Sequence, residues 1–316
     1  MTETAADRTG LVLVTGAAGF IGRHVVRALA DNGYRVAALQ HRTPLPADLT
    51  PLCERVVSGD ISDPQVRERA LDQVHTVCHL SAYIPARMAD LGEADHCNRI
   101  NALGAMELAG AAAQRGVARF IHLSTANMYA QSDSPRTESD LVFPHQLGTA
   151  YFVSKLAGEV YVSNIAERTG MTVLILRIAS PYGPGEPMAK VIPTFLRLAA
   201  AGKPLRMVNG GVARYNYVHV KDVAIIVAKA VNSGSGGIYN VASGEHISVL
   251  ELGQLIVALQ RDGRADLEVD PAEPDAFLGF APLSIEKTTR TWHFAPHLIT
   301  DGLRDYHQYL LQRGEI

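Results

Sequence analysis

The sequence predicts an α/β protein with a doubly wound, parallel sheet and a smaller second lobe. Short apolar runs of the length typical of buried parallel strands alternate with helical patterns, at about 25 to 35 residues per unit. A glycine-rich turn joins the first run to the first helix, and a proline- and glycine-rich segment at 180–187 marks a crossover out of the sheet. We therefore expect right-handed connections between the strands.

The first strand–helix unit is LVLVTGAAGFIG at 11–22. Gly16, Gly19 and Gly22 repeat at three-residue spacing as the chain enters an amphipathic helix. Gly16 allows a tight turn, Gly19 lets the backbone approach a pyrophosphate, and Gly22 permits close packing of the helix on the strand. The helix N-terminus would present free N–H groups to the anion. The pattern predicts a dinucleotide-binding loop, and an ordinary strand–turn–helix is the alternative.

The other elements are expected in a regular order. Strands are expected at 34–40, 55–58, 76–80, 120–124, 171–177 and 237–241, and helices after Pro64, through 101–114 and 151–155, and at 190–201, 221–231, 249–259 and 300–311. Residues 10–180 and 217–244 are expected to form a dinucleotide-binding domain, and residues 181–216 and 245–316 a substrate-binding lobe.

Composition narrows the classes of partner. The 316-residue chain has a formal net charge of −3 and no long basic run, so it shows no electrostatic footprint for nucleic acid or a membrane. No span reaches the ~18 apolar residues of a membrane helix and the polar first residues do not resemble a signal peptide, so we expect a cytoplasmic protein with a small-molecule substrate. Three scattered cysteines predict no disulfide framework, and the spacing of His75 and His79 within a strand predicts no metal site.

The end of the second strand bears on the choice of cofactor. An NAD site of this design usually places a carboxylate there to hold the ribose 2′-OH, whereas this chain has Gln40, His41 and Arg42. His41 and Arg42 could instead pair with a 2′-phosphate. NADP(H) is therefore favoured, and NAD(H) is the alternative if Arg42 is a solvated loop residue.

Tyr151 and Lys155 are four residues apart in a helical pattern, so they lie one turn apart on the same face. A nearby ammonium, together with an oxidised nicotinamide ring, would favour the phenolate and lower the pKa of the tyrosine toward a working range. The pair alone would also suit an exposed helix face. The other motifs of the sequence are what favour a catalytic role for this pair.

Those motifs resemble a known family. GDI at 59–61, HLSA at 79–82, ST at 124–125, LR at 176–177, YGP at 182–184 and VHVKDVA at 218–224 accompany the glycine loop and the Tyr151–Lys155 pair. In order and spacing they resemble the extended short-chain dehydrogenase/reductases of the NAD-dependent epimerase/dehydratase family, over residues 10–305. The resemblance implies a Rossmann-type fold and an NAD(P)-dependent oxidoreductase.

By that resemblance Thr125, Tyr151 and Lys155 are the catalytic set. Tyr151 would exchange a proton with the substrate oxygen while hydride moves to or from the nicotinamide, Lys155 would hold the nicotinamide ribose and tune Tyr151, and Thr125 would hydrogen-bond the reacting oxygen. The expected cofactor contacts are Gly16, Gly19, Phe20, Ile21, Gln40, His41, Arg42, Asp60, Ile61, Leu80, Ser81, Ala82 and Lys155.

The segment after Thr125 separates the reactions of the family. The 4,6-dehydratases of nucleotide sugars carry an Asp-Glu pair or a lone Glu there, related decarboxylases keep a Glu, and epimerase-reductases of the fucose-synthase kind carry a cysteine. Ala126 and Asn127 can neither donate nor accept the required proton. Two reactions are left: net reduction by a ketoreductase, which we favour, or C4-type epimerisation with NAD. A dinucleotide-binding regulatory protein is a third hypothesis, against which the intact Tyr151 argues.

The substrate side departs from relatives that bind nucleotide diphosphate sugars. Those usually have Asn at the position of Ser180, Arg at that of Tyr215 and Arg in the segment that here reads EPD at 273–275. The substrate is expected to be a modified sugar nucleotide or a sugar-like ketone without a diphosphate. The expected substrate contacts are Asn127, Ser180, Arg206 and Tyr215. The family commonly dimerises through helices near 95–115 and 147–168, so the resemblance also implies a homodimer.

Overall fold

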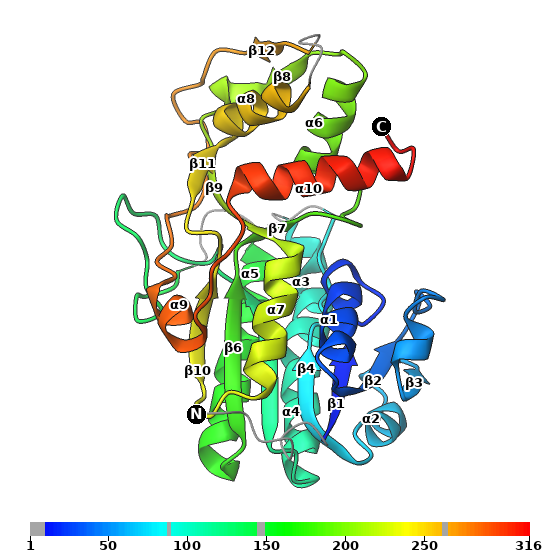
Figure 1. The fold of residues 1–316 in the computed structure, drawn as a ribbon. Helices are drawn as coiled ribbons and strands as arrows, with labels where there is room; N and C mark the ends of the chain where they lie inside the picture. Colours follow the sequence, from blue (N-terminus) through cyan, green and yellow to red (C-terminus); the bar gives the residue numbers. More distant parts are fainter. Residues whose placement is uncertain (1–9, 87–89, 144–148, 261–264) are drawn as a thin grey trace. The chain divides into compact units, whose positions relative to one another are not determined.

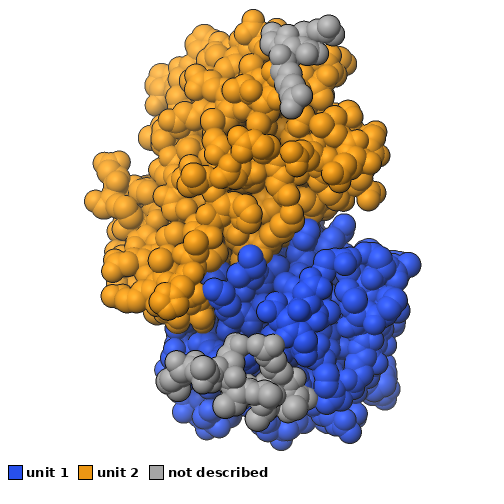
Figure 2. Space-filling view, in the orientation of Figure 1, with its two compact units in different colours: residues 1–128, 142–178, 223–239 blue, residues 129–141, 179–222, 240–316 orange. Residues whose placement is uncertain are grey.

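The computed structural model describes residues 10–86, 90–143, 149–260 and 265–316. The chain divides into two compact units (Figure 2). Unit 1 comprises residues 1–128, 142–178 and 223–239, and unit 2 comprises residues 129–141, 179–222 and 240–316. The chain therefore re-enters unit 1 twice, and each unit is assembled from segments far apart in the sequence.

A seven-stranded sheet in the order β10-β6-β5-β4-β1-β2-β3 forms the centre of unit 1 (Figure 1). The neighbouring pairs from β6 to β3 are all parallel. The order of strands reverses between β1 and β4, which is the mark of a doubly wound sheet and confirms the predicted fold class. The strands are β1 (Leu11–Thr15), β2 (Arg35–Gln40), β3 (Arg55–Ser58), β4 (Val74–His79), β5 (Arg119–Thr125), β6 (Thr172–Ile178) and β10 (Gly237–Val241).

Helices flank this sheet, and their apolar stripes face it. α1 buries Val25, Val26 and Leu29 completely, as their helical spacing predicts. α2 begins at Pro64, directly after Asp63, whose side chain accepts the Gln65 N–H at 2.8 Å. The helices are α1 (Phe20–Asp31), α2 (Pro64–Ala70), α3 (Ala94–Cys97), α4 (Gly104–Gln114), α5 (Thr149–Thr169) and α7 (Val220–Val231), with 3₁₀ turns at Thr50–Leu52 and Leu91–Glu93.

The helix expected through 101–114 starts differently in the structure. Residues Asn98–Leu103 form a π-helical turn, and α4 begins only at Gly104. The buried Asn101 lies in this turn, where its amide nitrogen donates to the Tyr83 carbonyl at 2.9 Å and its oxygen accepts the Tyr83 N–H at 2.8 Å. Helical periodicity cannot reveal such bonds, since the partner backbone lies 18 residues earlier in the chain.

Unit 2 contains two small sheets that are not predicted from the sequence. β7 (Ser180–Tyr182) pairs in parallel with β9 (Arg214–His219), which pairs antiparallel with β11 (His246–Ser248). β8 (Leu205–Met207) pairs in parallel with β12 (Leu267–Val269). Four of these strands have only three residues, which is too short to show an alternating pattern.

The helices of unit 2 agree better with the sequence. α6, α8 and α10 lie within one residue of the predicted ranges at each end, whereas α9 is not predicted. The helices are α6 (Val191–Ala200), α8 (Val249–Leu259), α9 (Glu286–Trp292) and α10 (Ile299–Gln312), with a 3₁₀ turn at Val208–Gly211. α6, α8 and α10 share one core, in which Leu196, Leu252 and Leu303 are fully buried. Trp292 on α9 is buried as well. In the described part of the chain, no helix combines the length and apolar character needed to cross a membrane.

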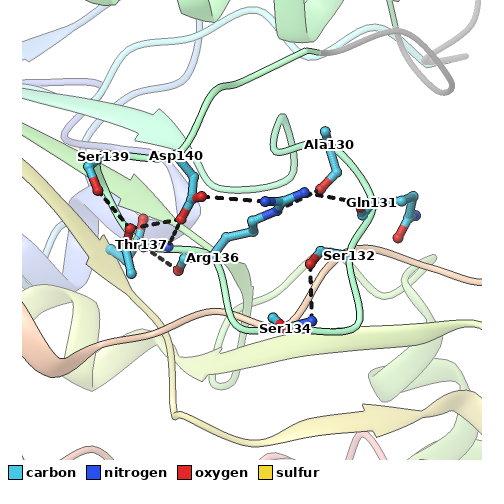
Figure 3. Close-up of polar contacts among 9 residues, drawn as sticks. Ala130, Gln131, Ser132, Ser134, Arg136, Thr137, Ser139 and Asp140 are labelled. Atoms are coloured by element: carbon cyan, nitrogen blue, oxygen red, sulfur yellow. Dashed lines mark hydrogen bonds and ion pairs between the residues drawn. The ribbon is translucent and has the colours of Figure 1, made fainter.

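Polar contacts, and no helix or strand, hold the segment at 129–141 together (Figure 3). The Arg136 guanidinium donates to the carbonyls of Ala130 at 3.1 Å and Gln131 at 3.0 Å, and it pairs with Asp140 at 3.4 Å. The Asp140 carboxylate also accepts the N–H and the hydroxyl of Thr137, each at 2.7 Å. These bonds give a defined shape to the stretch that follows β5 and the short segment Ala126–Met128.

Candidate functional site

The predicted cofactor contacts all belong to unit 1 and cluster at the carboxyl edge of its sheet. Gly16 directly follows β1, Gln40 ends β2, Asp60 follows β3 and Ser81 follows β4. Open α/β sheets bind ligands at this edge, next to the point where the strand order reverses. Here that point lies between β1 and β4, so the structure brings the predicted residues together at the place where the fold offers a site.

Two glycines pack the loop after β1 against its neighbours. Gly16 has a φ of +67°, and a Cβ built on it would lie 3.0 Å from the Ser81 nitrogen. A Cβ on Gly22 would lie 2.0 Å from the Gly16 carbonyl oxygen, so no larger residue fits there. The N-cap of α1 is Gly19, which has no side chain to cap the first N–H groups of the helix. The loop therefore fits the pyrophosphate of a dinucleotide.

Thr15 connects the two central strands beside this loop. Its hydroxyl oxygen accepts the backbone N–H groups of Leu80 and Ser81, each at 3.2 Å, and lies 2.9 Å from Nδ1 of His79. The predicted ribose contacts and the glycine loop are thus joined through one side chain. Neither Thr15 nor His79 is predicted as a site residue. The available signal is that two polar residues stand in otherwise apolar strands, LVLVT and VHTVCH.

The residues at the end of β2 differ in whether their side chains are already engaged in contacts within the protein. Gln40 uses both groups of its amide within the protein, donating to Ser58 Oγ at 2.8 Å and accepting the Leu45 N–H at 2.6 Å. His41 Nε2 lies 3.9 Å from a carboxylate oxygen of Asp60. Arg42 is exposed. Among the described residues, no ion pair of Arg42 is seen that would have to break before its side chain could move to a bound anion. Arg42 is therefore a better candidate than Gln40 or His41 for binding a 2′-phosphate.

Asp60 is held by the turn that follows β3. Its Oδ1 accepts the Ser62 N–H at 2.9 Å, and this backbone hydrogen bond is the main cause of its lowered pKa. The charges of His41 and Arg42 act in the same direction. Asp60 is therefore ionised at neutral pH and oriented by the loop, as a hydrogen-bond acceptor at the adenine end of a cofactor would have to be.

α5 carries Tyr151 and Lys155 on one face, and Lys155 is buried, with 3% exposure. The Lys155 ammonium donates to the Leu123 carbonyl of β5 at 2.5 Å. Burial lowers the pKa of Lys155 to about 8, against the opposing charge of Glu159. The lysine is thus mostly an ammonium at neutral pH and titrates just above it.

Tyr151 behaves differently from the sequence-based expectation. The sequence predicts a pKa lowered by the Lys155 ammonium together with an oxidised nicotinamide ring, whereas in the protein alone burial, and next the charge of Cys97, raises the pKa of Tyr151 to about 12. Burial of the phenol is the main cause of the raised pKa, and the predicted lowering also needs the charge of the nicotinamide ring. In the protein alone Tyr151 is protonated, which suits a proton donor.

A buried asparagine and a serine brace the start of α5. Ser154 lies between the two candidate residues and its hydroxyl donates to the Tyr151 carbonyl at 2.7 Å. The same hydroxyl accepts from the amide nitrogen of Asn101 at 3.0 Å. Asn101 also holds the backbone of Tyr83, two residues after Ser81. This brace links the segment after β4, where ribose contacts are predicted, to α5, which carries Tyr151 and Lys155. In the sequence, the only signal of the brace is that Asn101 and Ser154 are polar residues in helical segments with many small or apolar residues.

Thr125 ends β5 and is buried, with 7% exposure. Its Oγ1 accepts the Asn127 N–H at 3.2 Å, which leaves the hydroxyl proton to donate to another acceptor. Ala126 is buried with 3% exposure and Asn127 is half-buried. Thr125, Tyr151 and Lys155 all belong to unit 1, together with Asn127.

The other predicted substrate contacts belong to unit 2. Ser180 and Tyr215 lie on the paired strands β7 and β9, and Arg206 lies on β8 of the separate two-stranded sheet. Arg206 is exposed and pairs with Asp270 at 2.9 Å, so its charge is already partly neutralised. The Tyr215 ring packs edge-on against Phe280 with 5.5 Å between the ring centroids. Unit 2 thus offers an aromatic surface at Tyr215, where relatives that bind a diphosphate carry a cation.

The sequence profile of the NAD dependent epimerase/dehydratase family matches residues 12–242, which is most of the chain. The chain belongs to this family. The dTDP-4-dehydro-6-deoxy-D-allose reductase of Streptomyces bikiniensis is 28% identical over 318 aligned positions, covering 95% of both chains. The dTDP-D-glucose 4,6-dehydratase of Mus musculus is 28% identical over 271 positions, covering 82% of this chain and 75% of its own. The solved structure of MoeE5 in complex with UDP-glucose and NAD matches with a TM-score of 0.84 at 27% identity, covering 97% of this chain and 100% of that one.

Membership of the NAD-dependent epimerase/dehydratase family confirms the resemblance seen in the sequence motifs. The chain is an enzyme of the NAD-dependent epimerase, reductase and dehydratase group, with a Rossmann-type fold. The relatives above include a reductase and a dehydratase, so membership alone does not select the reaction. The choice has to come from the residues of the site.

Proposed function

We propose that this family member is an NADPH-dependent ketoreductase that acts on a sugar or sugar-like ketone, with or without a nucleotide diphosphate. The observation that carries the proposal is the presence of Thr125, Tyr151 and Lys155 in unit 1, combined with a Thr125–Asn127 segment that holds neither a carboxylate nor a thiol. Ketone reduction needs one proton donor at the oxygen, which Tyr151 supplies. Dehydration and decarboxylation need a further acid or base, which Ala126 and Asn127 cannot supply.

In the proposed reaction, different residues of unit 1 bind the cofactor, bind the substrate oxygen and donate the proton. When bound, the nicotinamide cofactor supplies the hydride. The glycine loop and Ser81 would hold the cofactor, and the hydroxyl groups of Thr125 and Tyr151 would bind the carbonyl oxygen of the substrate. As negative charge develops on that oxygen, Tyr151 donates its proton, and the Lys155 ammonium stabilises the phenolate that remains.

The preference for NADPH rests on Arg42. This side chain is exposed next to the negatively charged Asp60, and β2 ends in Gln40, whose amide is already engaged. An exposed arginine at this position can pair with a 2′-phosphate, which a 2′-OH does not offer. NAD with C4-type epimerisation is the second candidate, because MoeE5, whose structure matches this one, binds NAD.

We also propose that α5 forms a homodimer interface. Val153, Val160 and Tyr161 are exposed on this helix, at 43%, 59% and 38%. Apolar side chains spaced seven and eight residues apart make a stripe that a second helix could cover. Light scattering on the purified protein tests this, and replacement of Val160 by a charged residue should yield a monomer.

One assay separates the candidate reactions. The protein is incubated with NADPH and a nucleotide-linked 4-keto-6-deoxy sugar, and oxidation of NADPH is followed by absorbance. A ketoreductase consumes NADPH in step with the ketone. An epimerase would instead convert UDP-glucose to UDP-galactose with no net change in its cofactor, and a dehydratase would form a keto sugar from UDP- or dTDP-glucose. Either of those outcomes would contradict the proposed reductase.

A further inference from the structure

The surroundings of Lys155 are buried and contain little negative charge. The rings of His79 on β4 and His122 on β5 stack with centroids 5.5 Å apart. The charge of Lys155 helps to lower the pKa of both histidines, which shows that they lie near the ammonium. Burial is the main cause, and it brings the pKa of His79 to about 3. Both rings are therefore neutral at physiological pH and cannot offset the charge of the lysine.

Glu159 brings a carboxylate to the face of α5 that carries Lys155. It lies one helical turn after the lysine and is buried, with 3% exposure. Its charge raises the pKa of Lys155, whereas burial lowers it. Among the described residues, Glu159 is the acidic group whose charge acts on Lys155, and the Leu123 carbonyl accepts a hydrogen bond from the ammonium.

Arg177 on β6 holds Glu159 in place. Nη2 of Arg177 lies 2.7 Å from one carboxylate oxygen, and Nε lies 3.1 and 3.2 Å from the two oxygens. Arg177 is also buried, with 4% exposure. A buried ion pair is a weak source of stability, because the cost of desolvating both charges offsets their attraction. A gain in stability is therefore a weak explanation for this buried pair. A stronger one is that Glu159 lies one helical turn from Lys155 and its charge acts on the lysine.

We propose that Glu159 is a positioning residue that keeps Lys155 in its ammonium form, and that Arg177 fixes the Glu159 carboxylate for this purpose. The inference rests on the proposed function in that it takes the Lys155 ammonium to assist Tyr151. Glu159 touches neither substrate nor cofactor in this scheme. Its effect reaches the reaction through the charge of Lys155, so it should appear as a change in pH dependence.

The test measures the protonation of Lys155 directly, without substrate. The protein is labelled with a trace of acetic anhydride over a range of pH, and the extent of labelling at Lys155 is read by peptide mass spectrometry. The wild-type midpoint should lie near or above pH 8, consistent with the lysine pKa of about 8. The midpoint should fall by about one unit in Glu159→Gln, because the opposing charge is gone. Glu167→Gln, at an exposed position on the same helix, should leave the midpoint unchanged.

A second variant guards against a folding defect. Glu159→Gln leaves Arg177 buried without its charged partner, which can unfold the protein. The double variant Glu159→Met with Arg177→Met removes both charges with side chains of suitable size, so no buried charge is left unpaired. Because the positive charge of Arg177 is lost as well, the midpoint should still fall, but by less than in Glu159→Gln. An unchanged midpoint in a folded variant, or a wild-type midpoint below pH 7, would overturn the proposal.

The outcome is independent of the reaction that the enzyme performs. If the Lys155 midpoint shifts but the protein never oxidises NADPH with any keto sugar, the reductase proposal fails and the role of Glu159 stands. If NADPH is oxidised and the Lys155 midpoint does not move, the reductase proposal stands and the role of Glu159 fails. In the active enzyme the shift should also appear as an alkaline loss of turnover that begins at lower pH, with the KM for the ketone nearly unchanged.

Discussion

The hydroxyl of Thr15 lies 2.9 Å from Nδ1 of His79, and so ties together the last residues of two neighbouring strands, β1 and β4. Because the hydroxyl oxygen already accepts two N–H groups, from Leu80 and Ser81, its proton must go to His79 Nδ1. The ring proton of His79 is therefore on Nε2. One hydroxyl thus sets the distance between the glycine loop and the strand end that we expect to hold the ribose.

Thr15→Val should loosen this connection. The substitution keeps the shape of the side chain but leaves the Leu80 and Ser81 N–H groups and His79 Nδ1 without their partner, at a cost of about 1–3 kcal/mol in the free energy of unfolding. Affinity for the cofactor should fall as well. Urea denaturation and a calorimetric titration with NADPH measure the two effects. Thr15→Ser keeps the hydroxyl and should restore most of both, and a Thr15→Val protein with unchanged stability would contradict the role assigned to this bond.

Tyr151→Phe should lower turnover by two or more orders of magnitude, because the variant has no proton to donate to the carbonyl oxygen. Binding of the cofactor should stay nearly intact, since the phenol makes no predicted contact with it. Initial rates of NADPH oxidation and a fluorescence titration with NADPH give the two numbers. Full activity in Tyr151→Phe would rule out the proposed mechanism, and a regulatory protein without catalysis would show no dependence on this residue.

Much of unit 1 can be predicted because its elements are local. Four or more consecutive apolar residues reveal a strand buried on both faces, and the glycine spacing at 16–22 reveals the turn that follows it. α8 shows the same principle in unit 2. Its predicted start at Val249 agrees with the structure, where Ser248 and Glu251 form a capping box with bonds of 3.1 and 2.6 Å.

The features that could not be predicted depend on contacts between distant residues. Asn101 meets Tyr83 and Ser154, and Glu159 meets Arg177 across the space between α5 and β6. Nothing in the local pattern of either residue indicates its partner. The raised pKa of Tyr151 could not be predicted either, because its main cause is burial, which depends on residues distant in the sequence.

Arg42→Ala tests the choice of cofactor. Loss of the guanidinium should weaken NADPH binding by roughly tenfold or more, because a charge-assisted bond to the 2′-phosphate contributes about 1.5–3 kcal/mol. Binding of NADH should change little. Calorimetric titrations of wild type and variant with both cofactors give the comparison. If wild type binds NADH more tightly, or if Arg42→Ala keeps its NADPH affinity, the 2′-phosphate argument fails and C4-type epimerisation with NAD becomes the better hypothesis.

Glu186→Gln should stabilise the protein at alkaline pH. One carboxylate oxygen of Glu186 is buried in unit 2 with no hydrogen-bond partner among the described residues, and burial raises the pKa of this side chain to about 8. Between its ordinary pKa near 4.5 and this value, the folded protein holds the proton and the unfolded chain does not. Stability therefore falls as pH rises through that range, and it is retained in full only below the ordinary pKa.

Glutamine resembles the neutral acid and cannot ionise, so the variant escapes this loss. Its melting temperature should exceed that of wild type at about pH 8, and the difference should close as the pH approaches about 4, where wild type is protonated in both states. Scanning calorimetry across this range measures the difference. Glu268→Gln, on the exposed side of β12, should show no such trend. A difference in melting temperature between Glu186→Gln and wild type that does not vary with pH would contradict this prediction. It would mean that the effect comes from packing, because ionisation of Glu186 is the only property of the two side chains that changes with pH.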